Sequence, residues 1–332
     1  MTVCCGSLLA RTGLRAAAML LVVSPLAAGA ADMRPVLDLD FPDPFVMPVP
    51  DGLIAYATNT RRGGERLNVQ MSRSSDGVHW STPVDAMPVA PRWARTGEPD
   101  IWAPEVLRIG ETYVLYFSAR NATLTRPDGL TLCVGAAVAD RPEGPFRAMP
   151  APLTCGGPEG VIDASPFADG ADLWLYVKTD GNCCHARVRF LAQRLSPDGL
   201  HLRGHATSIA GLASDHAWEG NVIEAPEMRR HEGQLQMFFS ANNFADARYA
   251  VGFARCASPS GPCEQAPENP ILASRAELVG PGHACVFDWR GQSWMAFAAW
   301  REAAPRYRAM YIALITWEGD VPRVGTAEAP KH

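Results

Sequence analysis

Five short motifs recur along the chain at a nearly constant distance, and this recurrence constrains the possible fold more than any other feature. Each motif opens an apolar stretch, and a turn then leads to a second stretch rich in aromatic and β-branched residues. The first key residues of the motifs lie 59, 61, 61 and 59 positions apart and are Asp43, Trp102, Asp163, Glu224 and His283. Short apolar stretches separated by Gly and Pro turns, with little helical periodicity, predict strands.

The regular spacing also predicts how these strands are arranged. Such a repeat is typical of sheets placed radially around an axis, because each unit can bury its apolar faces only against its neighbours. Five repeats of about 60 residues account for residues 31–332. We therefore expect an all-β fold, a single five-bladed β-propeller with four-stranded blades, and no second domain.

The first 30 residues have the layout of a secretory signal peptide. Arg11 and Arg15 precede an apolar run over residues 16–28, and small residues follow at positions 28–30. This order predicts cleavage after Ala30. The alternative is a transmembrane anchor, for which the run is short. We therefore expect a secreted or periplasmic protein that has no membrane association after cleavage.

The composition restricts the classes of molecule that the protein is expected to bind, and the cysteines are consistent with secretion. A formal net charge of −5 and a pI near 5.9 leave no basic footprint for nucleic acid and suit uncharged partners such as sugars. Cys256 and Cys263 flank one turn, and Cys133 and Cys155 flank another, so both pairs are predicted disulfides. Seven cysteines follow residue 30, an odd number that leaves at least one thiol free or paired between chains. The oligomeric state is open.

The five key residues converge if the chain forms a propeller, because equivalent positions of the innermost strands face the central channel. Three carboxylates, an indole and an imidazole would then surround one cavity, where unpartnered carboxylates are costly. Glycoside hydrolysis requires one carboxylic acid to protonate the leaving oxygen and a second carboxylate to activate water or attack directly. A third acidic group raises the pKa of the acid by like-charge repulsion.

In five motifs the sequence resembles glycoside hydrolase family 43 over nearly all of the chain after residue 30. The motifs span residues 41–46, 102–106, 161–167, 222–228 and 280–283. The resemblance implies an inverting glycosidase with Asp43 as general base, Glu224 as general acid and Asp163 as the residue that tunes and orients the acid. Glu227 is the rival of Glu224, but residues three apart on a strand face opposite sides, so only one can reach the cavity. Glu105 is expected to be structural.

The resemblance also implies roles for three further residues. Trp102 would stack on a sugar ring, the alternative being core packing. His283 would contact substrate, or a calcium or sodium ion on the propeller axis through water; the alternative is a hydrogen-bonded core histidine. Arg308, nine residues before Trp317, would contact substrate. The chemistry itself would require no cofactor.

The expected substrate is an oligosaccharide or polysaccharide of the plant cell wall. The resemblance favours an α-L-arabinofuranosidase that removes terminal or side-chain pentose residues from arabinan or arabinoxylan fragments. The alternatives are a β-xylosidase or endo-arabinanase of the same family, and a sugar-binding propeller without catalysis. Inversion would place the carboxyl groups of Asp43 and Glu224 roughly 6.5–9.5 Å apart, which leaves room for water.

Overall fold

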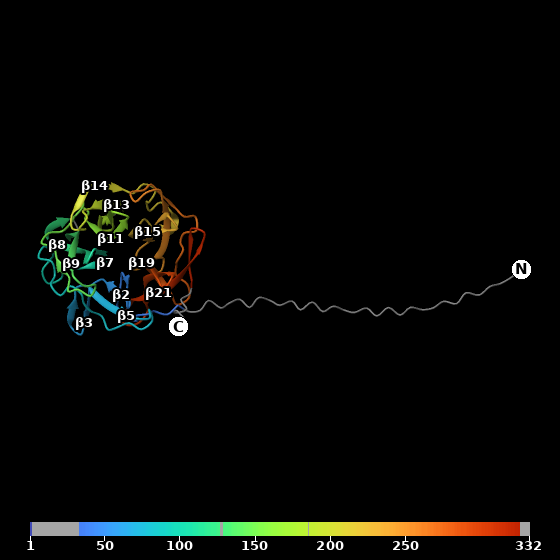
Figure 1. Ribbon diagram of the computed structural model, residues 1–332, viewed down its shortest axis with the longest axis horizontal. Coiled ribbons are helices and arrows are strands. Elements are labelled where there is room, and N and C mark those ends of the chain that lie inside the picture. Colours follow the sequence, from blue (N-terminus) through green and yellow to red (C-terminus); the bar gives the residue numbers. More distant parts are fainter. Residues whose placement is uncertain (2–32, 127–128, 185, 326–332) are drawn as a thin grey trace. The chain divides into compact units, whose positions relative to one another are not determined.

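A computed structural model describes Met1 and residues 33–126, 129–184 and 186–325. Apart from Met1, the predicted signal peptide lies outside these residues. The described chain forms five four-stranded antiparallel sheets, which surround a common centre (Figure 1). The prediction of an all-β, five-bladed propeller with four-stranded blades is therefore confirmed.

Each blade is built from strands that are close in sequence. Blade 1 contains β1 (Phe45–Val49), β2 (Gly52–Ala57), β5 (Gln70–Ser74) and β6 (Val84–Asp85), with a hairpin of β3 (Thr60–Arg62) and β4 (Glu65–Leu67) between β2 and β5. Blade 2 contains β7 (Trp102–Ile109), β8 (Thr112–Arg126), β9 (Gly129–Ala139) and β10 (Arg147–Ala148). Blade 3 contains β11 (Val161–Asp169), β12 (Asp172–Thr179), β13 (Phe190–Leu195) and β14 (Leu202–Ser208).

The last two blades follow the same plan. Blade 4 contains β15 (Ile223–His231), β16 (Gln234–Ala241), β17 (Ala250–Cys256) and β18 (Cys263–Gln265). Blade 5 contains β19 (Val279–Trp289), β20 (Gln292–Arg301), β21 (Tyr307–Glu318) and β22 (Val321–Val324). Two short 3-10 helices, η1 (Gly181–Cys184) and η2 (Ala217–Glu219), interrupt blade 3 and the link to blade 4. Among the described residues no helix has the length and apolar character to cross a bilayer.

One apolar cluster lies between each pair of neighbouring blades, so the ring of sheets is closed by packing. Burial of each large apolar side chain in these clusters contributes about 1.5–3 kcal/mol. Representative buried members are Tyr56 and Phe117 (blades 1 and 2), Val114 and Leu175 (2 and 3), Phe190 and Phe239 (3 and 4), Phe253 and Phe297 (4 and 5), and Leu53 and Phe287 (1 and 5).

Both predicted disulfides are confirmed. Cys133 is bonded to Cys155, and Cys256 is bonded to Cys263 at directly opposed positions of β17 and β18. Cys285 is free and buried on β19. The side chains of Cys183 and Cys184 lie outside the described part of the structure.

Candidate active site

The innermost strands of blades 2 to 5 carry an irregularity at the same point, and in blade 1 the left-handed residue Asp43 lies just before the innermost strand. The site is built from these positions. In blades 2 to 5 one inner-strand residue pairs with the second strand just before the irregularity, namely Trp102 with Ser118, Ile162 with Lys178, Glu224 with Ser240 and Gly282 with Ala298. The next residue has a positive φ, in the left-handed region that non-glycine residues rarely adopt. These left-handed residues are Asp43, Ala103, Asp163, Ala225 and His283.

The predicted alignment of the five motifs is therefore wrong by one residue in blades 2 and 4. Asp43, Asp163 and His283 are the left-handed residues of their blades, but Trp102 and Glu224 stand one position earlier. The left-handed residue in these two blades is an alanine, a type that gives no sign of a positive φ. The side chain of Glu224 is therefore attached one backbone position earlier than the side chains of the two aspartates.

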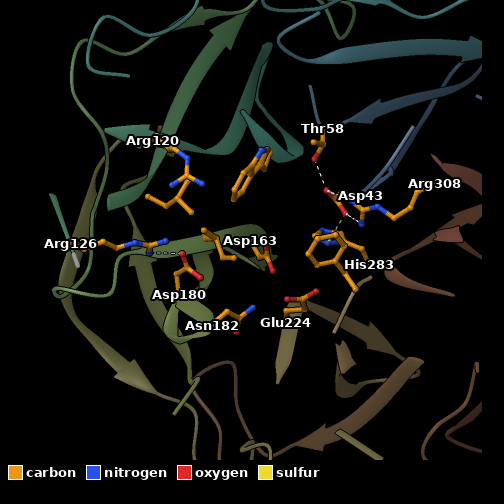
Figure 2. A pocket seen from close by; sticks show the side chains of 14 residues that line it. Asp43, Thr58, Arg120, Arg126, Asp163, Asp180, Asn182, Glu224, His283 and Arg308 are labelled. Carbon is orange, nitrogen blue, oxygen red and sulfur yellow. Dashed lines mark hydrogen bonds and ion pairs between the residues drawn. The ribbon is translucent and has the colours of Figure 1, made fainter. Parts of the chain in front are cut away.

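The structure nevertheless brings all six predicted site residues to one cavity. A cavity of about 380 Å³ is lined by Asp43, Trp102, Asp163, Glu224, His283 and Arg308. Figure 2 shows the carboxyl groups of Asp43, Asp163 and Glu224 directed towards a common space. Glu227 does not line this cavity, as predicted, because the irregularity separates it from Glu224.

Asp43 is a buried carboxylate held by three partners. Arg308 Nη1 donates to its Oδ1 at 2.7 Å, Thr58 Oγ1 donates to its Oδ2 at 2.6 Å, and His283 Nδ1 lies 3.4 Å from Oδ1 (Figure 2). Burial alone would raise the pKa of Asp43, but the Arg308 guanidinium and His283 outweigh it, and the pKa falls below its usual value. Asp43 is therefore ionised at neutral pH, and Arg308 anchors it.

Glu224 is bound at both carboxylate oxygens. Lys178 Nζ lies 2.8 Å from Oε2, and the Tyr249 hydroxyl donates to Oε1 at 2.7 Å. Burial opposes ionisation, but the Lys178 ammonium outweighs it, so the pKa of Glu224 is lowered. The expected rise in the pKa of Glu224 is therefore wrong for the site without a sugar.

The raised pKa belongs instead to Asp163. Burial raises it, and the neighbouring Glu224 carboxylate adds to the rise. Asp163 Oδ2 accepts a hydrogen bond from the backbone N–H of Ala225 at 2.9 Å, which joins blade 3 to blade 4. Two adjacent carboxyl groups of this kind titrate as a unit, so a proton taken up by the pair can reside on either member.

A glycine next to His283 makes room for Tyr249. A Cβ atom on Gly282 would lie 1.9 Å from the Tyr249 ring, so any larger residue would displace the ring that donates to Glu224. Neither Tyr249 nor Lys178 was predicted. The sequence does distinguish Lys178, because the equivalent residues are all hydroxyl residues in three other blades: Thr58 directly after β2, Ser118 on β8 and Ser240 on β16.

Trp102 lies at the cavity wall and is half-buried, as a stacking platform requires. The Arg120 guanidinium lies 5.3 Å from the Trp102 ring centre, within cation–π range. Arg120 Nε donates in turn to Asp100 at 2.6 Å, which holds the guanidinium in place. Arg120 also lines the cavity and was not predicted.

A buried ion pair forms the outer wall. Arg126 Nη1 lies 2.6 Å from Asp180 Oδ2, and both side chains line the cavity together with Asn182 and Phe244 (Figure 2). Fixed polar groups of this kind orient sugar hydroxyls in binding sites. Sequence patterns did not indicate these residues, because they lie outside the repeated motifs: Arg126 ends the long strand β8, and the other three residues lie between strands.

The described residues do not form a directly liganded metal site on the axis. Within residues 33–126, 129–184 and 186–325 no group of three or more His, Cys, Asp or Glu side chains could hold an ion. The one imidazole there, of His283, has its Nδ1 beside Asp43, which is already paired with Arg308. An ion near His283 would have to keep a shell of water, and no catalytic step is assigned to it.

The water-coordinated axial ion therefore stays a proposal with a simple test. Calcium prefers oxygen ligands, so an ion beside His283 should be removed by excess EDTA. We expect the midpoint of thermal unfolding to fall after chelation and to recover with added calcium. Unchanged unfolding and unchanged turnover in EDTA would contradict an exchangeable ion.

The opposite end of the channel holds a second acidic pair. Glu105 and Glu227 line a separate cavity there, and Glu227 Oε2 accepts from the backbone N–H of Val286 at 2.7 Å. Ser165 and Cys285 occupy the equivalent positions in blades 3 and 5, so the two glutamates are specific to blades 2 and 4. Burial raises the pKa of Glu227 to about 7.

This raised pKa predicts a pH-dependent stability. Glu227 binds its proton more tightly in the folded state, so folding loses free energy as pH rises from about 4.5 through about 7. The Glu227→Gln variant keeps the oxygen acceptor but cannot ionise. Between pH 4.5 and pH 8, we therefore expect the free energy of unfolding of the native protein to fall by about 3 kcal/mol more than that of the variant. Urea unfolding at several pH values measures this, and parallel curves for both proteins would contradict it.

One cavity in the centre of the propeller thus contains an ionised carboxylate, Asp43, and an adjacent pair of carboxyl groups, Asp163 and Glu224. Glycoside hydrolysis requires carboxyl groups on both sides of the scissile bond, and this arrangement can supply them. Comparison with known proteins agrees. The chain belongs to glycosyl hydrolases family 43, whose sequence profile matches residues 33–322. The predicted family is thus confirmed, and with it an enzyme of an inverting glycoside hydrolase family.

Individual relatives are more distant. An extracellular endo-alpha-(1->5)-L-arabinanase from Thermotoga petrophila is 32% identical over 95 residues, which cover 24% of this chain and 19% of that relative. A thermostable family-43 glycoside hydrolase superposes with a TM-score of 0.76 at 24% identity, covering 90% of this chain and 99% of that one. An endo-1,4-beta-xylanase from Bacteroides thetaiotaomicron superposes with a TM-score of 0.72 at 25% identity, covering 89% and 97%.

Proposed function

We propose that the protein is an inverting α-L-arabinofuranosidase that removes terminal or side-chain pentose residues from plant cell-wall polysaccharide fragments. One observation carries the proposal: Asp43, held ionised by Arg308, shares a cavity with the Asp163–Glu224 pair. A site with one fixed base and one protonated pair can deprotonate water and protonate a leaving group in the same step.

The proposed reaction is a single displacement. Asp43 removes a proton from a water molecule, whose oxygen attacks the anomeric carbon. The bond to the leaving oxygen breaks as Glu224 delivers a proton to that oxygen, and the sugar is released with inverted configuration. Asp163, tied to the peptide of Ala225, orients Glu224 and exchanges the proton with it. Trp102 and Arg308 would contact the sugar.

The description of one relative favours arabinose as the sugar that the protein releases. The Thermotoga petrophila protein is described as an arabinanase, although the aligned segment covers 19% of it. The Bacteroides thetaiotaomicron protein is described as an endo-1,4-beta-xylanase, which supports xylose as the alternative sugar and, with it, the alternative of a β-xylosidase. The cavity must accept one five-carbon sugar in either case, so the substrate panel described below is the deciding experiment.

One observation favours endo-arabinanase as a second candidate. A larger cavity of about 730 Å³ adjoins the first and shares Asn182, Glu224 and Phe244 with it. Since Glu224 would protonate the leaving group, this second cavity lies where the rest of a polymer would extend. Cleavage inside linear arabinan would use that space, whereas removal of single residues would not need it.

A panel of substrates separates these functions. We expect turnover of an aryl α-L-arabinofuranoside, little turnover of an aryl β-D-xyloside, and release of single arabinose residues from arabinan fragments. Proton NMR should show β-L-arabinofuranose as the first product. Early release of oligosaccharides from linear arabinan would favour the endo-acting candidate, and an absence of turnover with retained sugar binding would identify a non-catalytic propeller.

Secretion or a periplasmic location is part of the same proposal. Two disulfides are typical of proteins from oxidising compartments. Polymeric cell-wall substrates are also met outside the cytoplasm. Fractionation of cells that express the full chain, followed by N-terminal sequencing, should find the protein outside the cytoplasm and beginning near Ala31.

A further inference from the structure

The chain uses lysine almost nowhere, and this makes the position of Lys178 informative. Its sequence contains 30 lysine and arginine residues, and only Lys178 and Lys331 among them are lysines. A single lysine therefore stands between residues 31 and 330, on β12 of blade 3. In the equivalent place blades 1, 2 and 4 have the hydroxyl residues Thr58, Ser118 and Ser240.

The hydroxyl residues share one structural task. Each accepts a hydrogen bond from the backbone N–H of the left-handed residue in the next blade. The three bonds are Ala103 to Thr58 at 2.9 Å, Asp163 to Ser118 at 3.1 Å and His283 to Ser240 at 2.7 Å. They satisfy a buried donor at the irregularities of blades 2, 3 and 5, which would otherwise cost free energy.

Lys178 cannot perform this task, because an ammonium group has no acceptor. The corresponding N–H, that of Ala225, donates instead to Asp163 Oδ2 at 2.9 Å. The exchange of a hydroxyl for lysine thus coincides with two changes in blade 3. Asp163 is tied to the peptide that follows Glu224, and the ammonium is available to bind Glu224 itself.

The ammonium group is buried and points at one oxygen. The Lys178 side chain has 0% exposure, and its Nζ lies 2.8 Å from Glu224 Oε2. Lys178 is not among the described residues that line the cavity, so it would act through Glu224 rather than on the sugar. The Tyr249 hydroxyl, at 2.7 Å from Oε1, fixes the other side of the same carboxylate.

We propose that Lys178 is a positioning residue of the reaction, which fixes the carboxyl group of Glu224 and supplies the charge that limits the Asp163–Glu224 pair to one proton. The proposal rests on the proposed roles of Glu224 and Asp163. Two adjacent buried carboxylates repel each other, and one ammonium balances one of them. With Lys178 present, the neutral state of the three groups contains a single shared proton, which is available to the leaving group.

The surrounding charges do not replace this role. Tyr249 is a neutral donor, because burial and the Glu224 carboxylate raise its pKa. Arg308 is bonded to Asp43. His283 lies beside that carboxylate and also lowers the pKa of Asp163 and of Glu224, but among the described ion pairs the one that reaches Glu224 is that of Lys178. Asp43 adds negative charge near Tyr249, and Asp180 adds negative charge near Lys178. A lysine suits the place better than arginine does, because a compact ammonium fits a single fully buried contact.

Activity against pH tests the proposal. In Lys178→Met the pair loses its balancing charge, so the alkaline limb of kcat/KM should move up by about one pH unit or more. The loss of orientation should lower kcat by about 10- to 100-fold. Lys178→Arg keeps the positive charge, so the pH of its alkaline limb should be close to that of the native enzyme. Its kcat should recover less fully. A lowered kcat with an unmoved limb in Lys178→Met would overturn the proposal and leave a merely structural lysine.

A second measurement does not depend on turnover or on a variant of Lys178. Protein labelled with carbon-13 at lysine Cε has two lysine signals, and Lys331→Met leaves that of Lys178 alone. We expect this signal to shift as the carboxyl pair titrates, and the step to disappear in Glu224→Gln. Should Lys178→Met fail to fold, this titration decides. A pH-independent signal, or one that is unaltered by Glu224→Gln, would overturn the proposal.

The two experiments also separate this proposal from the proposed function. If no pentoside is hydrolysed but the Lys178 signal follows Glu224, the charge balance is correct and the assigned reaction is wrong. If pentosides are hydrolysed with inversion but the Lys178 signal does not change in Glu224→Gln, the assigned reaction is correct and the proposed role of Lys178 is wrong.

Discussion

Replacing Asp43 with asparagine should lower kcat by about 10⁴-fold on every pentoside, whatever its leaving group. Asp43 would activate the attacking water, and that step is required equally for poor and good leaving groups. Asparagine keeps the shape but cannot accept the proton. Steady-state kinetics on aryl pentosides with leaving groups of different acidity measure the effect.

The Asp43→Asn result needs a folded protein and a neighbouring control. Removal of the charge leaves buried Arg308 without its carboxylate, which costs about 3 kcal/mol of stability. Circular dichroism and the unfolding midpoint should therefore accompany the kinetics. Asp40, which accepts from Thr60 at 2.8 Å, provides a control, and Asp40→Asn should retain turnover.

The stereochemistry of the product provides an independent test of Asp43 as the general base. A first-formed sugar with inverted configuration is expected if Asp43 acts through water. A product that retains the configuration of the substrate would make Asp43 a nucleophile that attacks the sugar directly. A loss of activity that depends on the leaving group in Asp43→Asn would also contradict the base assignment.

Replacing Glu224 with glutamine should divide substrates into two groups. Natural oligosaccharides have poor leaving groups that require protonation, and we expect kcat to fall by about 10³-fold on them. Aryl pentosides with acidic phenols depart without a proton and should lose little. The ratio of the two losses, measured in one buffer, is the diagnostic quantity.

The chain offers a matched control for this variant. Glu227 lies on the same strand, is buried, and lines the cavity at the other end of the channel. Glu227→Gln should therefore leave the activity on both groups of substrates near that of the native enzyme. Equal losses on good and poor leaving groups for Glu224→Gln would remove Glu224 from the role of acid.

Much of the fold was predictable because a propeller is assembled from local units. Each blade joins strands that follow one another along the chain, so hydrogen-bonded neighbours are also sequence neighbours. Turns and alternating apolar residues therefore carry the information. The disulfide between Cys256 and Cys263 was predictable for the same reason, since the two residues face each other across one hairpin.

The candidate catalytic residues were predictable from their recurrence, but their backbone positions were not. Asp43, Asp163 and Glu224 stand out because charged residues recur where an inner strand normally carries apolar or small ones. The left-handed residues Ala103 and Ala225 give no such signal, because alanine occurs in every kind of structure. The predicted alignment of the five motifs was therefore wrong by one residue in blades 2 and 4.

The sequence by itself determined the number of blades, the set of acidic residues and their convergence on the central channel. Only the tertiary structure decided how each of them is charged. Asp43 is ionised because of Arg308, which is 265 residues away, and Glu224 is bound by Lys178 from the preceding blade. Electrostatic interactions depend on distance in space and on burial, and neither quantity can be read from the order of residues along the chain.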